Sequence, residues 1–131
     1  MPGERDFRES GKRMTKAVRI EKTGGPEVMQ LVAVDLAKPE PGEVRIKQTA
    51  IGLNYIDTYH RSGLYPVKLP SGLGQEAVGV VEELGQGVTT LKLGDRVAYG
   101  NGPIAAYAQA RNIPAPRAAN TPASLSAPPA P

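Results

Sequence analysis

The sequence predicts a mainly β fold, a partly open β-barrel with one short helix. Two observations lead to this prediction: short apolar segments with a period of two recur along the chain, and Gly- and Pro-rich turns separate them. Short strands joined by such turns are typical of small barrels rather than of parallel sheets with crossover helices. At 131 residues, the chain is expected to form one domain with a modest core.

Six short strands account for most of the apolar pattern. Residues 43–50, EVRIKQTA, alternate Val44, Ile46 and Ala50 with charged or hydroxyl side chains, which is the pattern of a half-buried strand. The paired glycines and the proline of residues 23–27 predict a hairpin turn. The expected strands are residues 17–21, 29–34, 43–50, 78–84, 95–99 and, closing the set, 106–108.

The segment GLNYIDTYHRSGLYP, residues 52–66, differs from the strands. Asn54 or Asp57 can cap the first turn of a short helix, and Gly63 supplies a natural stop. The segment also contains three tyrosines between two weakly patterned apolar stretches. From spacing alone, these tyrosines either wedge the helix onto the barrel with their hydroxyls at water, or line the rim of a pocket.

Both ends of the chain are expected to be disordered. Residues 1–13 contain seven charged residues and one large apolar side chain, Phe7, too little apolar surface to offset the entropy of ordering. Residues 116–131 are rich in Ala and Pro, and proline removes backbone donors that helices and sheets need. The expected domain is therefore residues 14–115, and residues 1–13 are interpreted as an upstream extension because MTKAVRI resembles a natural start.

Composition excludes several classes of function. The chain has no cysteine, so disulfides, thiolate metal ligands and a cysteine nucleophile are excluded. The net charge of +3 does not predict nucleic-acid binding, because residues 14–113 carry eleven Lys and Arg against ten Asp and Glu and contain no basic run. No apolar run approaches the ~18 residues of a membrane span, and no secretory signal is present, so a cytoplasmic protein without a membrane partner is expected.

Four blocks of sequence carry a resemblance to a known family. These blocks are GGPEVMQL, PGEVRIKQTAIGLNYIDTYHRSGLYP, LPSGLGQEAVGVVEELGQGVTTLKLGDRVAY and AAYAQARNIPA. In this order and spacing, they closely resemble the amino-terminal part of bacterial NADPH:quinone oxidoreductases, the zeta-crystallin-like branch of the medium-chain dehydrogenase/reductase superfamily. The resemblance covers residues 14–115 and implies a GroES-like β-barrel that carries the substrate half of an active site.

The resemblance also implies which residues form that site. The family's Asn and Tyr residues that match Asn54, Tyr59 and Tyr65 line the cleft near the nicotinamide of NADPH, and the positions of Asp57 and Arg61 share the same helical segment. The implied roles are catalytic for Asn54, Asp57 and Tyr59, cofactor-binding for Asn54, Tyr59 and Tyr65, and substrate-pocket for Tyr55, Arg61 and Tyr65. Hydride transfer to a quinone places negative charge on a carbonyl oxygen, to which a Tyr hydroxyl or an Asn amide can donate a hydrogen bond.

A zinc-independent member of the superfamily is expected. In its zinc-dependent alcohol dehydrogenases, a Cys occupies the place of Asn54 and a His precedes the Glu of a G-H-E motif, which here is Gly74-Gln75-Glu76. With no cysteine and a single histidine, His60, the chain cannot by itself assemble a zinc site of His and Cys ligands. His60 is expected to be a half-exposed helix residue. Glu76 is either a buried or capping carboxylate that supports the cleft floor, which is the favoured interpretation, or a catalytic group.

The G-x-G-x-x-A pattern of residues 100–105 is interpreted as a loop between barrel strands. Pro103 removes one of the amides that a dinucleotide fingerprint needs, and no acidic residue follows Asp95 to hold a ribose. Intact family members continue into a Rossmann domain that binds NADPH, and their last segment returns to complete the barrel. Both parts are expected to be absent from this chain, which leaves the barrel incomplete.

Two hypotheses of function therefore remain. The first is an oxidoreductase that transfers reducing equivalents from NADPH to a quinone or a related small carbonyl compound. The second is a non-catalytic GroES-like binding or assembly module, or an inactive fragment. In either case, the barrel surface against which a Rossmann domain packs would be exposed, and this would favour self-association. A homodimer is therefore expected.

Overall fold

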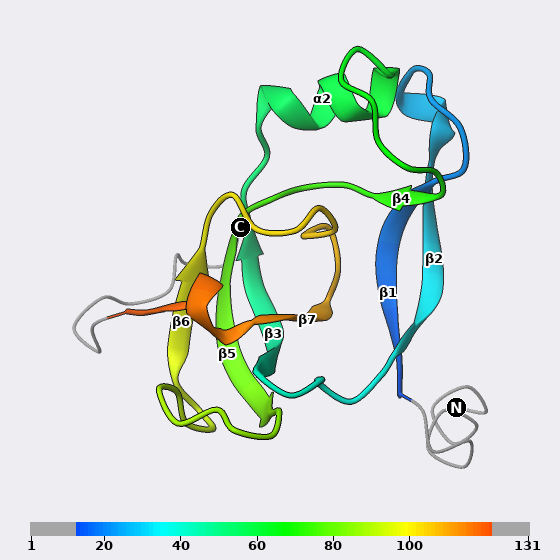
Figure 1. The fold of residues 1–131 in the computed structure, drawn as a ribbon. Coiled ribbons are helices and arrows are strands. Elements are labelled where there is room, and N and C mark those ends of the chain that lie inside the picture. Colours follow the sequence, from blue (N-terminus) through cyan, green and yellow to red (C-terminus); the bar gives the residue numbers. More distant parts are fainter. Residues whose placement is uncertain (1–12, 122–131) are drawn as a thin grey trace.

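The chain is mainly β, with one α-helix among the residues described (Figure 1). The computed structural model describes residues 13–121, so residues 1–12 of the expected leader and residues 122–131 of the expected tail lie outside the described residues. The elements are β1 (Arg13–Ile20), the 3-10 helix η1 (Pro26–Val28), β2 (Met29–Leu36), β3 (Glu43–Ile51), α2 (Tyr55–Ser62), β4 (Ser71–Gly72), β5 (Ala77–Leu84), β6 (Arg96–Tyr99), β7 (Ala110–Pro114), the 3-10 helix η2 (Ala115–Arg117) and β8 (Ala119–Asn120).

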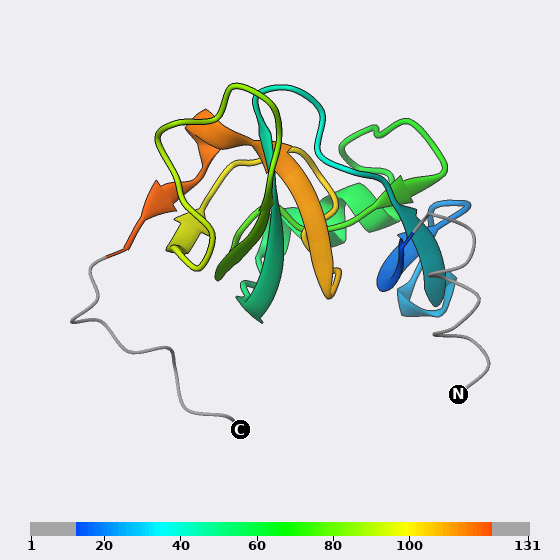
Figure 2. The ribbon, with the colours of Figure 1, turned by 90° about the horizontal axis from the view of Figure 1, so that it is seen from below.

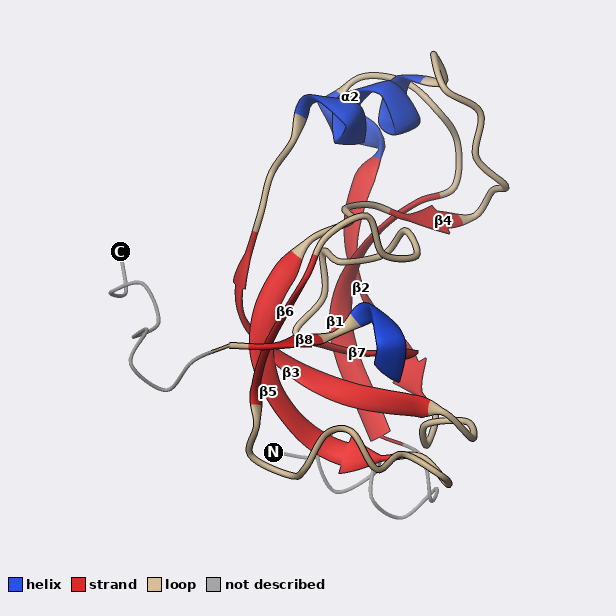
Figure 3. Cartoon of the chain, turned by 60° about the vertical axis from the view of Figure 1, so that its left-hand side comes forward, coloured by secondary structure: helices blue, strands red, loops and turns tan. Residues whose placement is uncertain are grey.

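These strands form two antiparallel sheets that do not close into a single barrel (Figures 1 and 3). One sheet has the order β2-β1-β4 and the other the order β7-β3-β5-β6-β8. Figure 2 shows the two sheets side by side from below. A bridge between Ala17 and Ala108 joins them, and the Val18 N–H donates to the Tyr107 carbonyl at 2.8 Å. The predicted partly open, mainly β fold is confirmed.

The predicted hairpin near the start of the chain is formed by β1 and β2. Their register runs from Arg13 opposite Leu36 to Ile20 opposite Met29, so both strands are longer than predicted. The connection contains η1, whose first residue is Pro26, where a missing N–H costs little. The Gly-Gly-Pro signal therefore gives a short 3-10 turn within the hairpin connection.

The central strand β3 has the predicted alternation. Val44 and Ile46 are fully buried, whereas the Arg45 side chain between them reaches Glu82 and Glu83, each at 2.8 Å. The five-stranded sheet covers the larger of two buried clusters, and the other lies beside the three-stranded sheet. The larger cluster comprises Val44, Ile46, Ala77, Val81, Leu91, Val97, Tyr99, Ala106, Ile113 and Ala115, and the smaller Ile20, Val28 and Leu73.

Two of the predicted boundaries differ from the structure. Residues 106–108 form no strand beyond the bridge at Ala108, because the Gln48 amide donates to the carbonyls of both Ala106 and Ala108, each at 2.7 Å. The last long strand is instead β7. The segment after it also has regular structure up to Thr121, because η2 turns the chain and β8 pairs with β6. The Thr121 N–H donates to the Arg96 carbonyl at 2.8 Å, so the ordered part extends past the predicted boundary at 115.

The predicted helix is α2, which lies across one end of both sheets (Figure 1). Asn54 is its N-cap residue, with extended backbone, and Asp57 occupies the third helical position. Gly63 ends the helix at φ 92°, a left-handed conformation in which a Cβ is unfavourable. Within residues 13–121, no helix is long and apolar enough to span a membrane.

Candidate functional site

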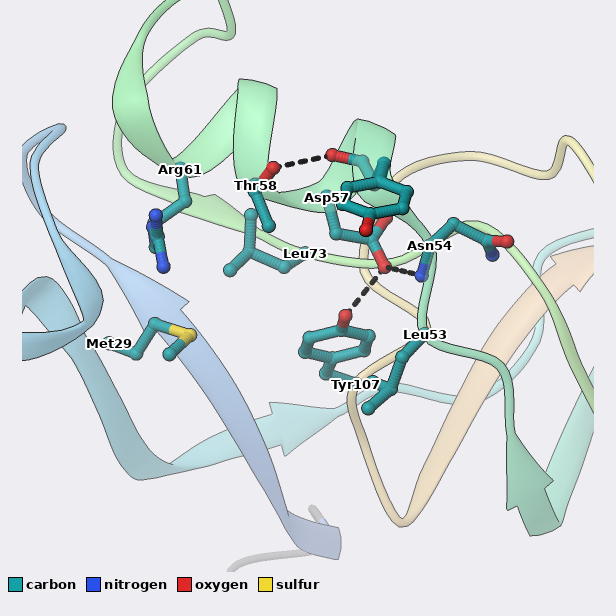
Figure 4. A pocket seen from close by; sticks show the side chains of 9 residues that line it. Met29, Leu53, Asn54, Asp57, Thr58, Arg61, Leu73 and Tyr107 are labelled. Atoms are coloured by element: carbon teal, nitrogen blue, oxygen red, sulfur yellow. Dashed lines mark hydrogen bonds between the residues drawn. The ribbon is translucent and has the colours of Figure 1, made fainter.

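A pocket of about 400 Å³ lies between α2, the start of β2 and the segments around Leu73 and Tyr107 (Figure 4). Most of its surface is contributed by apolar atoms. Leu73 and Asp57 are almost fully buried in its wall, whereas Leu53 and Tyr55 are 76% and 84% exposed. The lining residues are Met29, Leu53, Asn54, Tyr55, Asp57, Thr58, Arg61, Leu73 and Tyr107.

The buried carboxylate of Asp57 links α2 to the opposite side of the pocket. Its Oδ2 accepts the Tyr107 hydroxyl at 2.5 Å and the Asn54 N–H at 3.1 Å (Figure 4). The second bond is the carboxylate half of a capping box, since it satisfies a backbone donor at the helix N-terminus. Asp57 therefore holds the first turn of the helix and the tyrosine ring in one arrangement.

Backbone contacts place Tyr107 beneath the helix. Its N–H donates to the Leu73 carbonyl at 2.9 Å, and its own carbonyl accepts from Val18. A Cβ on Gly74 would lie 2.5 Å from the Tyr107 ring, so only a glycine there lets the ring pass. The side chain thus spans from the junction of the two sheets to α2.

A polar network on the sheet side fixes the segment that carries Tyr107. Gln48 donates to the carbonyls on both sides of Tyr107, and the Tyr99 hydroxyl donates to Gln48 in turn. Arg111 is buried, lies over the Tyr99 ring at 5.5 Å from its centroid, and donates to the Pro103 carbonyl at 2.8 Å. Side chains of the sheet therefore anchor residues 100–108 by hydrogen bonds, which is consistent with the interpretation of residues 100–105 as a loop.

Two tyrosines of this region carry altered acidity. Burial raises the pKa of Tyr107 well above its ordinary range, and the hydrogen bond to Asp57 and the charge of that carboxylate raise it further. Burial also raises the pKa of Tyr99, against the opposing effect of Arg111. The single hydroxyl proton of Tyr107 is already donated to Asp57, so Tyr107 can accept a hydrogen bond from a ligand but has no proton left to donate.

The structure brings four of the six predicted site residues to the pocket. Asn54, Tyr55, Asp57 and Arg61 all line it. The other two do not: Tyr59 and Tyr65 pack against each other edge to face, with their ring centroids 5.3 Å apart. Helix α2 therefore separates two surfaces, the pocket and a tyrosine pair defined by residues 59 and 65.

The expected burial of two residues is wrong. His60 is 7% exposed rather than half-exposed, because it lies on the side of α2 that is covered, with its ring 6.4 Å from that of Tyr65. Glu76 is exposed rather than buried. Its backbone carbonyl accepts from the Gly52 N–H at 3.1 Å, and its side chain lies so close to Gly52 that a Cβ there would overlap it. Glu76 therefore packs against the chain that leads from β3 to Asn54.

Five lining residues were not found from the sequence, and they come from four separate segments. Tyr107 had the clearest signal, as the one large side chain in the run AAYAQA. Leu73, between two glycines, is an isolated apolar residue whose burial depends on contacts across the sheet junction. The five are Met29, Leu53, Thr58, Leu73 and Tyr107. Among the residues described, no group of three or more His, Cys, Asp or Glu side chains is placed to hold a metal ion.

Comparisons with known proteins agree with this architecture. Residues 40–119 match the family model of the alcohol dehydrogenase GroES-like domain. The chain is 48% identical over 114 residues to quinone oxidoreductase 1 of Escherichia coli, a match that covers 86% of this chain and 35% of that protein. It is 54% identical over 97 residues to a quinone oxidoreductase of Pseudomonas aeruginosa, covering 73% of this chain and 30% of that protein.

A solved structure has the same fold. The quinone oxidoreductase of Escherichia coli in complex with NADPH superposes with a TM-score of 0.82 at 48% identity, over 85% of this chain and 34% of that one. The chain thus spans about a third of the length of the relatives it matches. With its two open sheets, single helix and family match, this chain belongs to the alcohol dehydrogenase GroES-like domain family and is similar within it to the quinone oxidoreductases.

Proposed function

We propose that this chain supplies the substrate side of an NADPH-dependent quinone oxidoreductase. The observation that carries the proposal is the similarity, at 48% identity and a TM-score of 0.82, to the Escherichia coli quinone oxidoreductase whose structure contains NADPH. The acceptor is a quinone or a related small carbonyl compound, and the protein acts in the cytoplasm as an enzyme without zinc.

The described residues fit one part of NADPH, the nicotinamide. Asn54 is exposed at the start of α2, and Tyr65 is 48% exposed beside Tyr59, so an amide and a flat aromatic surface are available there. Residues 100–105 do not fit the pyrophosphate, because the Gly102 and Ala105 amides already donate to Gln75 and Gly74, each at 3.0 Å. The pyrophosphate contacts are therefore proposed to come from residues other than those described.

In the proposed reaction, this chain orients the acceptor and stabilises its developing charge. NADPH, when bound, supplies the hydride. Either the amide of Asn54, beside the pocket, or the hydroxyl of Tyr59, at the tyrosine pair, donates a hydrogen bond to the carbonyl oxygen as negative charge builds there. Asp57 is a positioning residue, because its hydrogen bonds to the Asn54 N–H and to the Tyr107 hydroxyl fix the helix terminus that carries Asn54.

A non-catalytic binding or assembly module is the second candidate. The observation that favours it is the number of large apolar side chains at the surface, with Leu31 at 69%, Tyr55 at 84% and Leu64 at 66% exposed. Exposed apolar surface of this kind is typical of sites where another protein packs. A homodimer of this chain is the assembly proposed.

A titration of the 131-residue chain with NADPH separates the two candidates. Cofactor fluorescence and the thermal melt would be followed together, and NADPH oxidation would then be measured with a soluble quinone. Saturable binding, a raised melting temperature and quinone-dependent oxidation are expected for the reductase. A chain that melts cooperatively but neither binds nor oxidises NADPH would contradict reductase activity of this chain by itself and would favour the binding module.

A further inference from the structure

The pocket contains one cation, Arg61, that forms no direct ion pair with another described residue. Arg61 leaves α2 at the end opposite Asn54 and extends beside Met29 and Leu73 (Figure 4). Its Nε is enclosed by protein atoms and has no hydrogen-bond partner. The ion pairs between described side chains join Arg45 to Glu82 and Glu83, and Arg61 takes part in neither. A buried guanidinium nitrogen without an acceptor is unfavourable, so an acceptor for Nε is missing at this end of the pocket.

Asp57 does not supply that acceptor, although it precedes Arg61 by one helical turn. Its Oδ2 is occupied by Tyr107 and by the Asn54 N–H. Its Oδ1 is enclosed and without a partner. The pocket is therefore polarised, with a carboxylate fixed at the Tyr107 end and, at the Met29 end, a guanidinium without an ion pair among residues 13–121 (Figure 4).

The rest of the pocket is lined by apolar side chains, and its volume is small. The thioether of Met29, the side chains of Leu53 and Leu73 and the rings of Tyr55 and Tyr107 line an open pocket of about 400 Å³, near the lower end of the volumes of small-molecule sites. Met sulfur and aromatic rings make favourable contacts with flat unsaturated groups. This lining suits one planar unsaturated unit and disfavours a second charge.

We propose that this pocket binds a small planar carboxylate, with the carboxylate group at Arg61 and the unsaturated part against Leu73 and Tyr107. The guanidinium donates two parallel hydrogen bonds to the carboxylate, a geometry that Arg provides and Lys does not. The charge of Asp57 sets the opposite polarity and so fixes the direction in which the ligand enters. The proposal goes beyond the reductase function, because the ligand binds whether or not it is reduced and whether or not NADPH is present.

A purely structural role for Arg61 makes a different prediction. Arg61 lies in the last turn of α2, where a cation interacts favourably with the helix dipole, and its backbone carbonyl accepts from the Gly24 N–H at 2.9 Å. If this were its whole role, its replacement would lower the melting temperature and leave ligand affinity unchanged. Stability and affinity must therefore be measured on the same variants.

The test compares cinnamate with its neutral isostere cinnamamide on the full chain, without NADPH, by titration calorimetry. Cinnamate is expected to bind saturably and at least about tenfold more tightly than cinnamamide, as one charge-assisted contact provides. Arg61→Gln should remove that preference, Arg61→Lys should restore only part of it, and Asp57→Asn should increase cinnamate affinity because a repelling charge is lost. Lys92→Gln, an exposed residue between β5 and β6, is the charge-matched control and should bind as the parent does.

Three results would each overturn the proposal. They are equal affinity for the two compounds, an unchanged preference in folded Arg61→Gln, and the absence of binding by a parent chain that melts cooperatively. If Arg61→Gln fails to fold, the Arg61→Lys and Asp57→Asn variants decide, because the proposal requires opposite changes in cinnamate affinity. A chain that binds cinnamate but not NADPH would retain this inference while the proposed reductase function fails.

Discussion

At the scale of single residues, the side of α2 on which a side chain lies decides which surface it contributes to. Asp57 and Arg61 are directed to the pocket and Asn54 lines its edge, whereas Tyr59 packs with Tyr65 outside it. The predicted site is thus divided by α2 into a hydroxyl-bearing aromatic surface and a polarised apolar pocket. The two surfaces can be examined separately, because substitutions on one leave the contacts of the other in place.

Removal of the Tyr59 hydroxyl should affect turnover more than stability. In Tyr59→Phe the ring contact with Tyr65 remains, but the proposed hydrogen bond to the acceptor oxygen is lost. A fall of about 100- to 1,000-fold in the rate of quinone-dependent NADPH oxidation is expected, by analogy with the loss of one oxyanion donor. Initial rates and melting temperature would be compared, and unchanged kinetics would leave Tyr59 only a packing role.

The raised pKa of Tyr107 predicts a loss of stability in alkali. The folded state keeps the hydroxyl proton to a higher pH than the unfolded chain does, so this contribution is complete below the ordinary tyrosine pKa of about 10. It is lost as the pH rises from there towards the folded-state pKa. Urea midpoints measured between pH 9 and 11, about the ordinary pKa, should therefore fall more steeply for the parent chain than for Tyr107→Phe. Parallel curves would show that the Asp57 bond contributes nothing to the pH dependence.

At the scale of elements, α2 is defined by its ends rather than by its length. It has eight residues, too few to be stable alone, and the Asp57 bond to the Asn54 N–H, the Tyr107 contact and the Gly63 stop fix its position. The same local signals that predicted the helix also set the direction in which Asn54 points. Loss of either end should therefore disturb the site before it disturbs the sheets.

The Gly63 end can be examined with a matched pair of substitutions. Gly63→Ala should destabilise the fold by about 1–2 kcal/mol from the left-handed backbone alone, and further because its Cβ would lie 3.2 Å from Thr23. Gly87→Ala, at φ 82° with nothing within 4 Å, has the backbone cost without the crowding. Free energies of unfolding in urea should thus be lower for Gly63→Ala than for Gly87→Ala, and the reverse order would indicate that Thr23 moves freely.

At the scale of the whole molecule, two open sheets leave unpaired edges and apolar surface. In the three-stranded sheet, β2 is an edge strand of eight residues with one acidic residue, no lysine and no proline. Natural edge strands are usually protected by such residues against pairing with another chain. The open architecture is therefore expected to favour self-association.

A charge on the β2 edge should reduce that association. Leu31 is 69% exposed and is the third residue of the strand, so Leu31→Lys is expected to shift the chain towards monomer with little loss of stability. Thr89→Lys adds the same charge at an exposed loop position in the other half of the chain and is the control. Sedimentation velocity over a range of concentrations gives the readout, and equal association by both variants would place the interface elsewhere.

The sequence by itself determined five of the strands, the helix and the chemistry of that helix. Alternation in β3, the Gly-Gly-Pro turn and the local ends of α2 are encoded within a few residues, and so they were predictable. The tertiary structure alone decided that Tyr107 and Leu73 meet Asp57, that His60 is buried and that residues 115–120 are ordered. Each of these depends on contacts between groups far apart in the chain, such as Gln48 with Ala106 and β8 with β6. A local sequence pattern gives no information about the energies of such contacts. The charged groups of the pocket, Asp57 and Arg61, thus come from one helix, whereas Leu73 and Tyr107 reach the pocket only because the two sheets pack together.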